Sequence, residues 1–153
     1  MTIFDAIRKD DQEYLKLLLE EYPEQVNDRD TKGFTALILA SYLNKPALVQ
    51  ILIDANVDVD GRDHVGNTAL MGLCFKGNTE IAQLLIDAGA KINAVNNNGA
   101  TALTFAASFN QVEMVRLLLL NKAEKSVADQ TDKRPVDYAA DKGFLEVIDL
   151  LKA

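Results

Sequence analysis

The chain has 153 residues, of which 48% are hydrophobic and 25% are charged, as expected for one globular domain or one short repeat array rather than a disordered segment. The formal net charge is −7, and the 16 Lys and Arg residues form no run, which argues against nucleic-acid binding because phosphates would repel an acidic protein. No apolar stretch reaches the roughly 18 residues of a membrane span, and no signal-peptide core is present. Because Cys74 is the only cysteine, the sequence predicts a cytoplasmic protein without disulfides.

A period of 33 residues runs through the chain without insertion or deletion. It begins in residues 1–29, where the apolar positions match those of later segments, and it continues to the last residues. A fixed period of this length is typical of stacked supersecondary units. The clearest recurrences are the triplets Gly33, Gly66 and Gly99; Thr35, Thr68 and Thr101; Ala36, Ala69 and Ala102; and Leu37, Leu70 and Leu103.

Residues 63–95 show what one unit contains. Gly66 lies in a turn that calls for a positive φ angle, and Thr68 follows where its hydroxyl can cap a helix N-terminus. Two short stretches of helical apolar spacing come next, separated by Gly77-Asn78, and Gly89 follows the second stretch as a left-handed cap. Asn56 occupies the position of Gly89 in the preceding unit, and asparagine tolerates the same geometry. Neither helix would be stable alone, so stability must come from packing between units.

These two stretches resemble the signatures of ankyrin repeats. Residues 98–107, Asn-Gly-Ala-Thr-Ala-Leu-Thr-Phe-Ala-Ala, resemble the first-helix signature, and residues 80–94 resemble the second helix and hairpin. The Thr-Ala-Leu form is similar to that of bacterial members. The resemblance implies an all-α repeat solenoid, a single domain over 1–153 built of helix-turn-helix units with β-hairpin-like fingers. Its units would be 1–29, 30–62, 63–95, 96–128 and 129–153.

The sequence departs from the family signature at two positions of the first helix. Alanine replaces the usual proline except at Pro135, and the usual histidine, which ties the turn together, is replaced by other residues. We therefore expect the turns to lack that tie. The replacements for the histidine are Ile38, Met71, Thr104 and Asp137.

Ankyrin-repeat domains act as binding scaffolds, so the resemblance implies a protein partner on the concave face. The family's contact positions are the finger tips and the exposed side of the first helices, and several hold aromatic or large apolar groups here. An alternative is that these aromatics pack between first helices and only extend the core. The predicted partner-binding residues are Phe34, Ile38, Tyr42, Leu43, Asn67, Met71, Phe75, Lys76 and Phe109.

Acidic residues cluster at the first two internal turns. They could steer a basic partner, but we favour the interpretation that they form a solvated rim that keeps the protein soluble. The residues are Asp28, Asp30, Asp58, Asp60 and Asp63.

Sites of other chemistry are weakly represented. The string from Asn56 to Gly61 resembles a calcium loop, but Asn67 stands where the bidentate glutamate belongs. Cys74 and His64 are too few for zinc, and their register separates them into the stack and a finger tip. No glycine-rich phosphate loop is present. We therefore predict no catalytic residue, no metal and no cofactor.

The predicted function is a protein–protein interaction scaffold, including the role of an inhibitor or regulator of one target. We expect a monomer that binds neither nucleic acid nor membrane, with weak self-association left open. The alternative is a ligand- or calcium-dependent sensor, or an enzyme with an unrecognised site.

Overall fold

The computed structural model describes residues 1–153, and it consists of helices connected by turns and hairpin-shaped loops. Helices α1 to α10 follow one another in pairs, and one short 3-10 helix, η1, comes after the first pair. Their bounds are α1 Ile3–Arg8, α2 Gln12–Glu21, η1 Pro23–Asn27, α3 Ala36–Tyr42, α4 Pro46–Asp54, α5 Ala69–Lys76, α6 Thr79–Asp87, α7 Ala102–Ser108, α8 Val112–Leu120, α9 Pro135–Lys142 and α10 Leu145–Lys152.

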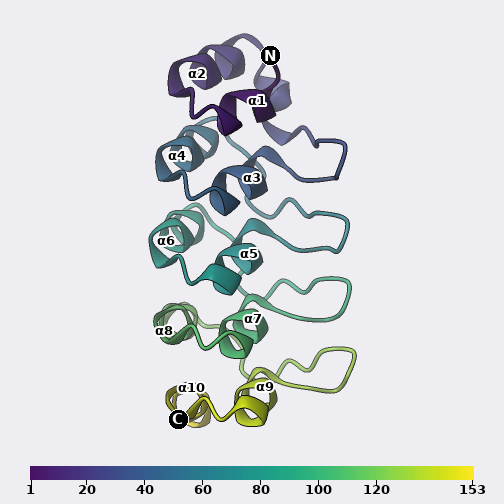
Figure 1. The fold of residues 1–153 in the computed structure, drawn as a ribbon, viewed down its shortest axis with the longest axis vertical. Coiled ribbons are helices and arrows are strands. Elements are labelled where there is room, and N and C mark those ends of the chain that lie inside the picture. Colours follow the sequence, from purple (N-terminus) through teal and green to yellow (C-terminus); the bar gives the residue numbers. More distant parts are fainter.

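The helix pairs stack in a single column with two layers (Figure 1). The odd-numbered helices form one layer and the even-numbered helices form the other, while the hairpin-shaped loops project from the side of the odd-numbered layer. The loops form no regular sheet, and one isolated antiparallel bridge joins Arg29 to Thr35. The predicted all-helical repeat stack is confirmed. We call the odd-numbered helices together with the hairpins the first-helix edge.

The predicted caps form where the repeat places them. The Thr68 hydroxyl accepts a hydrogen bond from the Met71 N–H at the start of α5. The turn glycine Gly66 has φ +83°, and the residues after the second helices, Gly89 and Asn56, have φ +94° and +62°. At these positions the local sequence therefore defines where a helix begins or ends.

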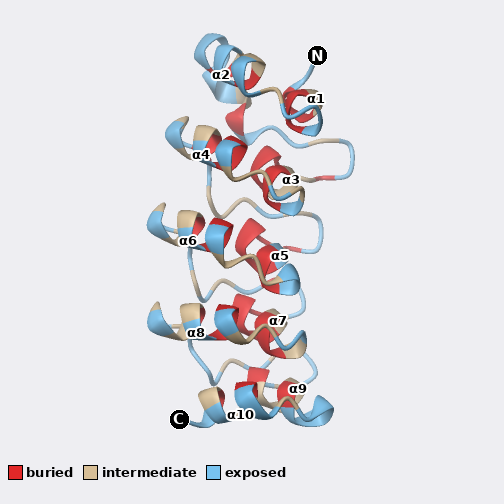
Figure 2. Cartoon of the chain, turned by 60° about the vertical axis from the view of Figure 1, so that its left-hand side comes forward, coloured by how far each residue is buried: buried red, intermediate tan, exposed pale blue.

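The core is one continuous cluster of 32 buried residues that runs the length of the column. In Figure 2 the buried residues, in red, lie on the inner sides of the helices, and exposed residues, in pale blue, lie on the outer sides and in the loops. Among the small residues that recur at one first-helix position, Ser41, Cys74 and Ala107 are buried, whereas Ala140 is exposed because no further helix covers that side of α9. No helix is both long enough and apolar enough to cross a membrane.

Candidate functional site

An apolar pocket lies on the first-helix edge, near the N-terminal end of the stack. It has a volume of about 370 Å³, and it brings together three of the predicted contact residues, Phe34, Ile38 and Tyr42. We call it the Phe34 pocket. Its full lining is Arg8 from α1, Asp30, Lys32 and Phe34 from the first hairpin, and Ile38, Leu39 and Tyr42 from α3.

The hairpin that supplies Phe34 is held by its own aspartate. Asp30 Oδ1 accepts the backbone N–H groups of Lys32 and Phe34, each at 2.9 Å. The next residue, Thr35, caps α3 through the N–H of Ile38 at 3.1 Å. Because the turn and the helix start are both fixed by side-chain acceptors, Phe34 and Ile38 reach the pocket from adjoining, well-defined segments.

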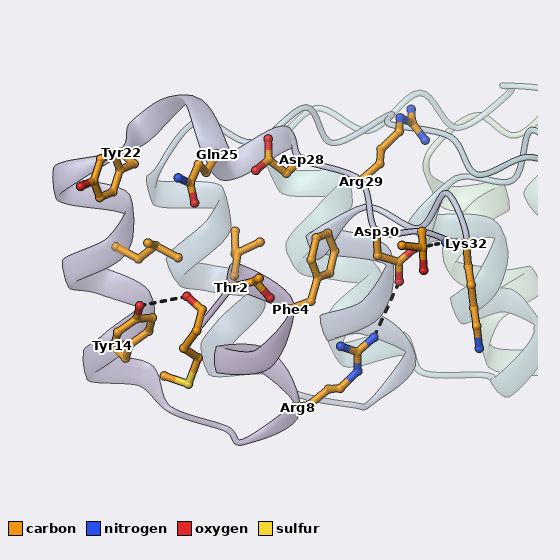
Figure 3. A pocket seen from close by; sticks show the side chains of 14 residues that line it. Thr2, Phe4, Arg8, Tyr14, Tyr22, Gln25, Asp28, Arg29, Asp30 and Lys32 are labelled. Carbon is orange, nitrogen blue, oxygen red and sulfur yellow. Dashed lines mark hydrogen bonds and ion pairs between the residues drawn. The ribbon is translucent and has the colours of Figure 1, made fainter.

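Positive charge borders this pocket. The Arg8 guanidinium lies 3.7 Å from Asp30 Oδ2, and the Asp30 side chain is only 12% exposed. Lys32 forms no ion pair, and Figure 3 shows its side chain extending from the hairpin with the ammonium away from Asp30. The single carboxylate of the lining is thus already engaged by two N–H groups and one guanidinium.

Three of the predicted partner-binding residues, Tyr42, Phe75 and Phe109, are exposed, at 62%, 52% and 41%. We call them the aromatic stripe. The rings of Phe75 and Phe109 contact each other, with centroids 4.3 Å apart and planes tilted by 54°. The alternative that these aromatics only extend the core is therefore wrong, because about half of each side chain is open to solvent.

Two lysines contact rings of the aromatic stripe. The Lys76 ammonium lies 3.7 Å from the Tyr42 ring centroid and donates to the Tyr42 carbonyl at 3.0 Å. Lys142 repeats the arrangement two steps along the stack, 5.4 Å from the Phe109 ring, with a 2.9 Å bond to the Ser108 carbonyl. Such cation–π contacts fix ring and ammonium in one geometry. Neither lysine forms an ion pair.

Gln111, the N-cap residue of α8, makes a further link back to the first helix α5. Its Nε2 donates to the Phe75 carbonyl at 3.1 Å, so an inter-helix bond to a first-helix carbonyl is kept where no lysine is available. These three bonds tie the C-terminal ends of α3, α5 and α7, where the stripe residues lie, to the helix pair that follows each of them.

The remaining predicted contact residues differ in exposure. Leu43 is half-buried and packs against the core. Asn67 is half-buried, and its Oδ1 accepts from Asn96 Nδ2 at 2.8 Å. The prediction that Met71 lies in an exposed slot is wrong, because it is only 2% exposed. Since α5 is flanked by both α3 and α7, this flexible side chain fills space inside the core.

A family model for ankyrin repeats matches residues 3–96 and 76–153, which together span nearly the whole chain. The chain belongs to the ankyrin-repeat family. No curated protein matches the sequence. Ankyrin repeats commonly mediate protein–protein interaction, and the family is typically a non-enzymatic scaffold.

Sequence reasoning missed a set of turn acceptors in these ankyrin hairpins. Each hairpin starts with an Asp or Asn whose side chain accepts N–H groups two and four residues later, as Asp63 does from Val65 and Asn67, both at 2.9 Å. The sequence does contain a signal for these acceptors, because they recur every 33 residues. These turns are therefore tied despite the missing histidine. The acceptors are Asp30, Asp63, Asn96 and Asp129.

The acidic cluster at the first two hairpins consequently has a structural role that the rim interpretation did not foresee. Asp30 and Asp63 tie their own turns, while Asp58 accepts from the N–H of Asp60 at 3.0 Å. Asp60 accepts from the N–H of Lys91, in the next loop, at 2.8 Å. Four of the five carboxylates of the cluster, all but that of Asp28, thus accept at least one backbone N–H, and these four include both carboxylates of the calcium-like string.

Two arginines of the hairpins were also missed. Arg29 donates to the Gly33 carbonyl at 3.1 Å and to the Arg62 carbonyl of the next hairpin. Arg62 repeats the pattern, with bonds to the carbonyls of Gly66 at 3.3 Å and Val95. Their identical spacing of 33 residues marks them as part of the scaffold.

The one thiol of the chain lies inside the stack. Cys74 is buried, and burial raises the pKa of its thiol, so the nucleophilic thiolate is disfavoured. His64 lies exposed on a hairpin. The Cys74–His64 pair is therefore not supported as a nucleophile and base.

The largest cavity lies at the N-terminal end, between α1, α2, η1 and the first hairpin (Figure 3). Its volume is about 740 Å³. Tyr14 and Met1 close one side through a 3.0 Å bond from the Tyr14 hydroxyl to the Met1 carbonyl. Arg8, Asp30 and Lys32 line this cavity as well as the Phe34 pocket, so the three charged groups lie where the two hollows meet.

Proposed function

We propose that residues 1–153 form one ankyrin domain of five units, 1–29, 30–62, 63–95, 96–128 and 129–153, that binds a protein partner at the first-helix edge. The observation that carries the proposal is the aromatic stripe of three exposed rings, one of which, Tyr42, also lines the Phe34 pocket. Aromatic side chains next to an apolar pocket are favoured interface anchors.

Rigidity supports this proposal. The stripe residues lie at the ends of helices tied to their neighbours by Lys76, Gln111 and Lys142. A surface held in its binding geometry loses little conformational entropy on association. A domain of this kind regulates or inhibits its target by covering part of the target's surface.

The proposal is tested by affinity capture from host lysate. Wild type is compared with a triple variant that carries Tyr42→Ala, Phe75→Ala and Phe109→Ala. A matched control carries three leucine-to-alanine changes at exposed positions of the even-numbered helices. These are Leu17, Leu120 and Leu145, which are 61%, 82% and 74% exposed.

We expect one protein to be retained by wild type and by the leucine control but lost with the aromatic variant. Circular dichroism and size-exclusion chromatography confirm that all three chains are folded and of equal size. Retention by the aromatic variant at the wild-type level would remove the first-helix edge as the binding surface. Loss with the leucine control instead would place the interface on the even-numbered helices.

A further inference from the structure

The charge around the Phe34 pocket is opposite in sign to that of the whole chain. The protein carries a formal charge of −7, yet three cations border the pocket: Arg8 and Lys32 line it, and Lys76 covers its Tyr42 wall. Asp30 is the only carboxylate of the lining. Both of its oxygens are engaged, Oδ1 by two backbone N–H groups and Oδ2 by Arg8.

The lysines of this edge retain free hydrogen-bond donors. An ammonium group has three N–H donors, and Lys76 and Lys142 each give one to a backbone carbonyl. Lys32, Lys76 and Lys142 form no ion pair, whereas Lys45, Lys133 and the arginines 8, 116 and 134 do. The unpaired cations on this edge are therefore available to carboxylates of another molecule.

Their spacing suits an extended segment. Lys76 and Lys142 lie two stacking steps apart, and helices pack at about 8 to 10 Å, which puts them roughly 20 Å apart. An extended chain covers that distance with about six residues, at roughly 3.3 Å per residue. The Phe34 pocket lies one step further toward the N-terminal end, beside Tyr42 and Lys76.

We infer that the partner presents an acidic, extended segment with one bulky apolar side chain. The apolar side chain enters the Phe34 pocket, and neighbouring carboxylates contact the unpaired cations Lys32 and Lys76. This inference rests on the proposed function and adds the chemistry of the partner. A basic segment is disfavoured because like charges placed together at an interface are costly.

The experiment is a selection of displayed random peptides of about twelve residues against the purified full chain. At roughly 3.3 Å per residue, such a peptide is longer than the three stacking steps from the Phe34 pocket to Lys142. We expect the enriched peptides to carry one large apolar residue flanked by Asp and Glu. The best peptide, labelled with fluorescein, is then titrated by fluorescence anisotropy. A second peptide, with serine in place of the apolar residue, is expected to bind at least about tenfold more weakly because the pocket stays empty.

Charge-reversal variants locate the peptide. Lys32→Glu combined with Lys76→Glu should weaken binding about tenfold or more, and added salt should weaken binding to wild type. Lys16→Glu is the matched control, because Lys16 is an exposed, unpaired lysine on α2. It should change the affinity less than about twofold, as expected for a distant surface charge.

Failure of this inference is distinguishable from failure of the proposed function. The selection could instead enrich neutral or basic peptides that bind the aromatic triple variant more weakly than wild type. That result would refute an acidic partner segment but would still support the first-helix edge as the binding surface. Acidic peptides indifferent to the Lys32 and Lys76 reversals would bind elsewhere and overturn the inference, as would a selection that enriches nothing. If wild type self-associates and the reversals abolish this, the occupant is a second copy and the inference is wrong.

Discussion

Replacing Gly66 by alanine should destabilise the protein through a contact between two hairpins. Gly66 has φ +83°, which costs an L-residue about 1 to 2 kcal/mol. A Cβ atom there would lie 2.6 Å from Asn97 Oδ1 and 2.9 Å from the Asn97 backbone nitrogen. Because a backbone atom is involved, the neighbouring hairpin must shift, and such overpacking adds about 1 to 3 kcal/mol. The expected loss is therefore about 2 to 5 kcal/mol.

Gly89→Ala is the matched control for backbone strain. Gly89 has φ +94°, but a Cβ atom at this position would have no neighbour within 4 Å, so only the cost of the positive φ, about 1 to 2 kcal/mol, applies. Urea unfolding of both variants and wild type gives the difference directly. Hydrogen exchange adds a local readout, because the Asn97 N–H donates to the Val65 carbonyl at 3.0 Å and should lose protection only in Gly66→Ala. Equal stability losses in the two variants would refute the close approach of the hairpins.

Three further outcomes follow from single residues. Gly72→Ala should raise stability by about 0.5 to 1 kcal/mol, because this exposed glycine lies inside α5 with free space around its Cβ position; an unchanged unfolding midpoint would contradict this. Native Cys74 should resist maleimide at neutral pH and react in urea, since burial raises the pKa of its thiol; rapid labelling of the native protein would contradict its burial. At Asp129, burial raises the pKa, but hydrogen bonds from Thr131, Tyr138 and the backbone outweigh it and lower the pKa to about 2. This stabilisation is present above about pH 4 and is lost as the pH falls toward 2, so Asp129→Asn should lose more stability relative to wild type at pH 5 than at pH 2 in acid-unfolding experiments, and a constant difference would refute the assignment.

The fold could be predicted because its determinants are local and periodic. The 33-residue spacing predicted the helix pairs, and single residues such as Thr68, Gly89 and Asn56 predicted caps and left-handed positions that the structure confirms. Each depends on backbone geometry within a few residues. The residues that cap a helix can therefore be predicted from sequence without knowledge of what packs against that helix.

The surface was harder to predict because exposure depends on stacking between units. Met71 and Thr104 occupy the same position as Ile38, yet they are buried and Ile38 is only half-buried, beside the pocket. The contact of Lys76 with the Tyr42 ring joins residues 34 apart. A residue pair of this kind follows from the offset between adjacent helices, which a periodic sequence pattern does not specify.

Departures from the period mark positions where the surface differs between units. On the even-numbered helices, Gln50 bonds to Asp54 and Gln83 bonds to Asp87, each at 2.8 Å. The same two positions in the next unit hold an arginine and Leu120, and this leucine is 82% exposed. It is the strongest competitor to the aromatic stripe as a binding anchor.

The neighbouring charges favour the aromatic stripe over Leu120 as the binding anchor. Next to Leu120, Arg116 is already paired with Glu113 at 3.5 Å and with Glu146 at 2.8 Å, so its guanidinium has little left to offer a partner. On the first-helix edge, Lys76 is unpaired and held against an aromatic ring. Unpaired, oriented charge next to apolar surface favours recognition, because the partner's charges replace water without first breaking an ion pair. Leu120→Asp should accordingly leave partner capture unchanged, and its loss in that variant would move the interface to the opposite layer of the stack.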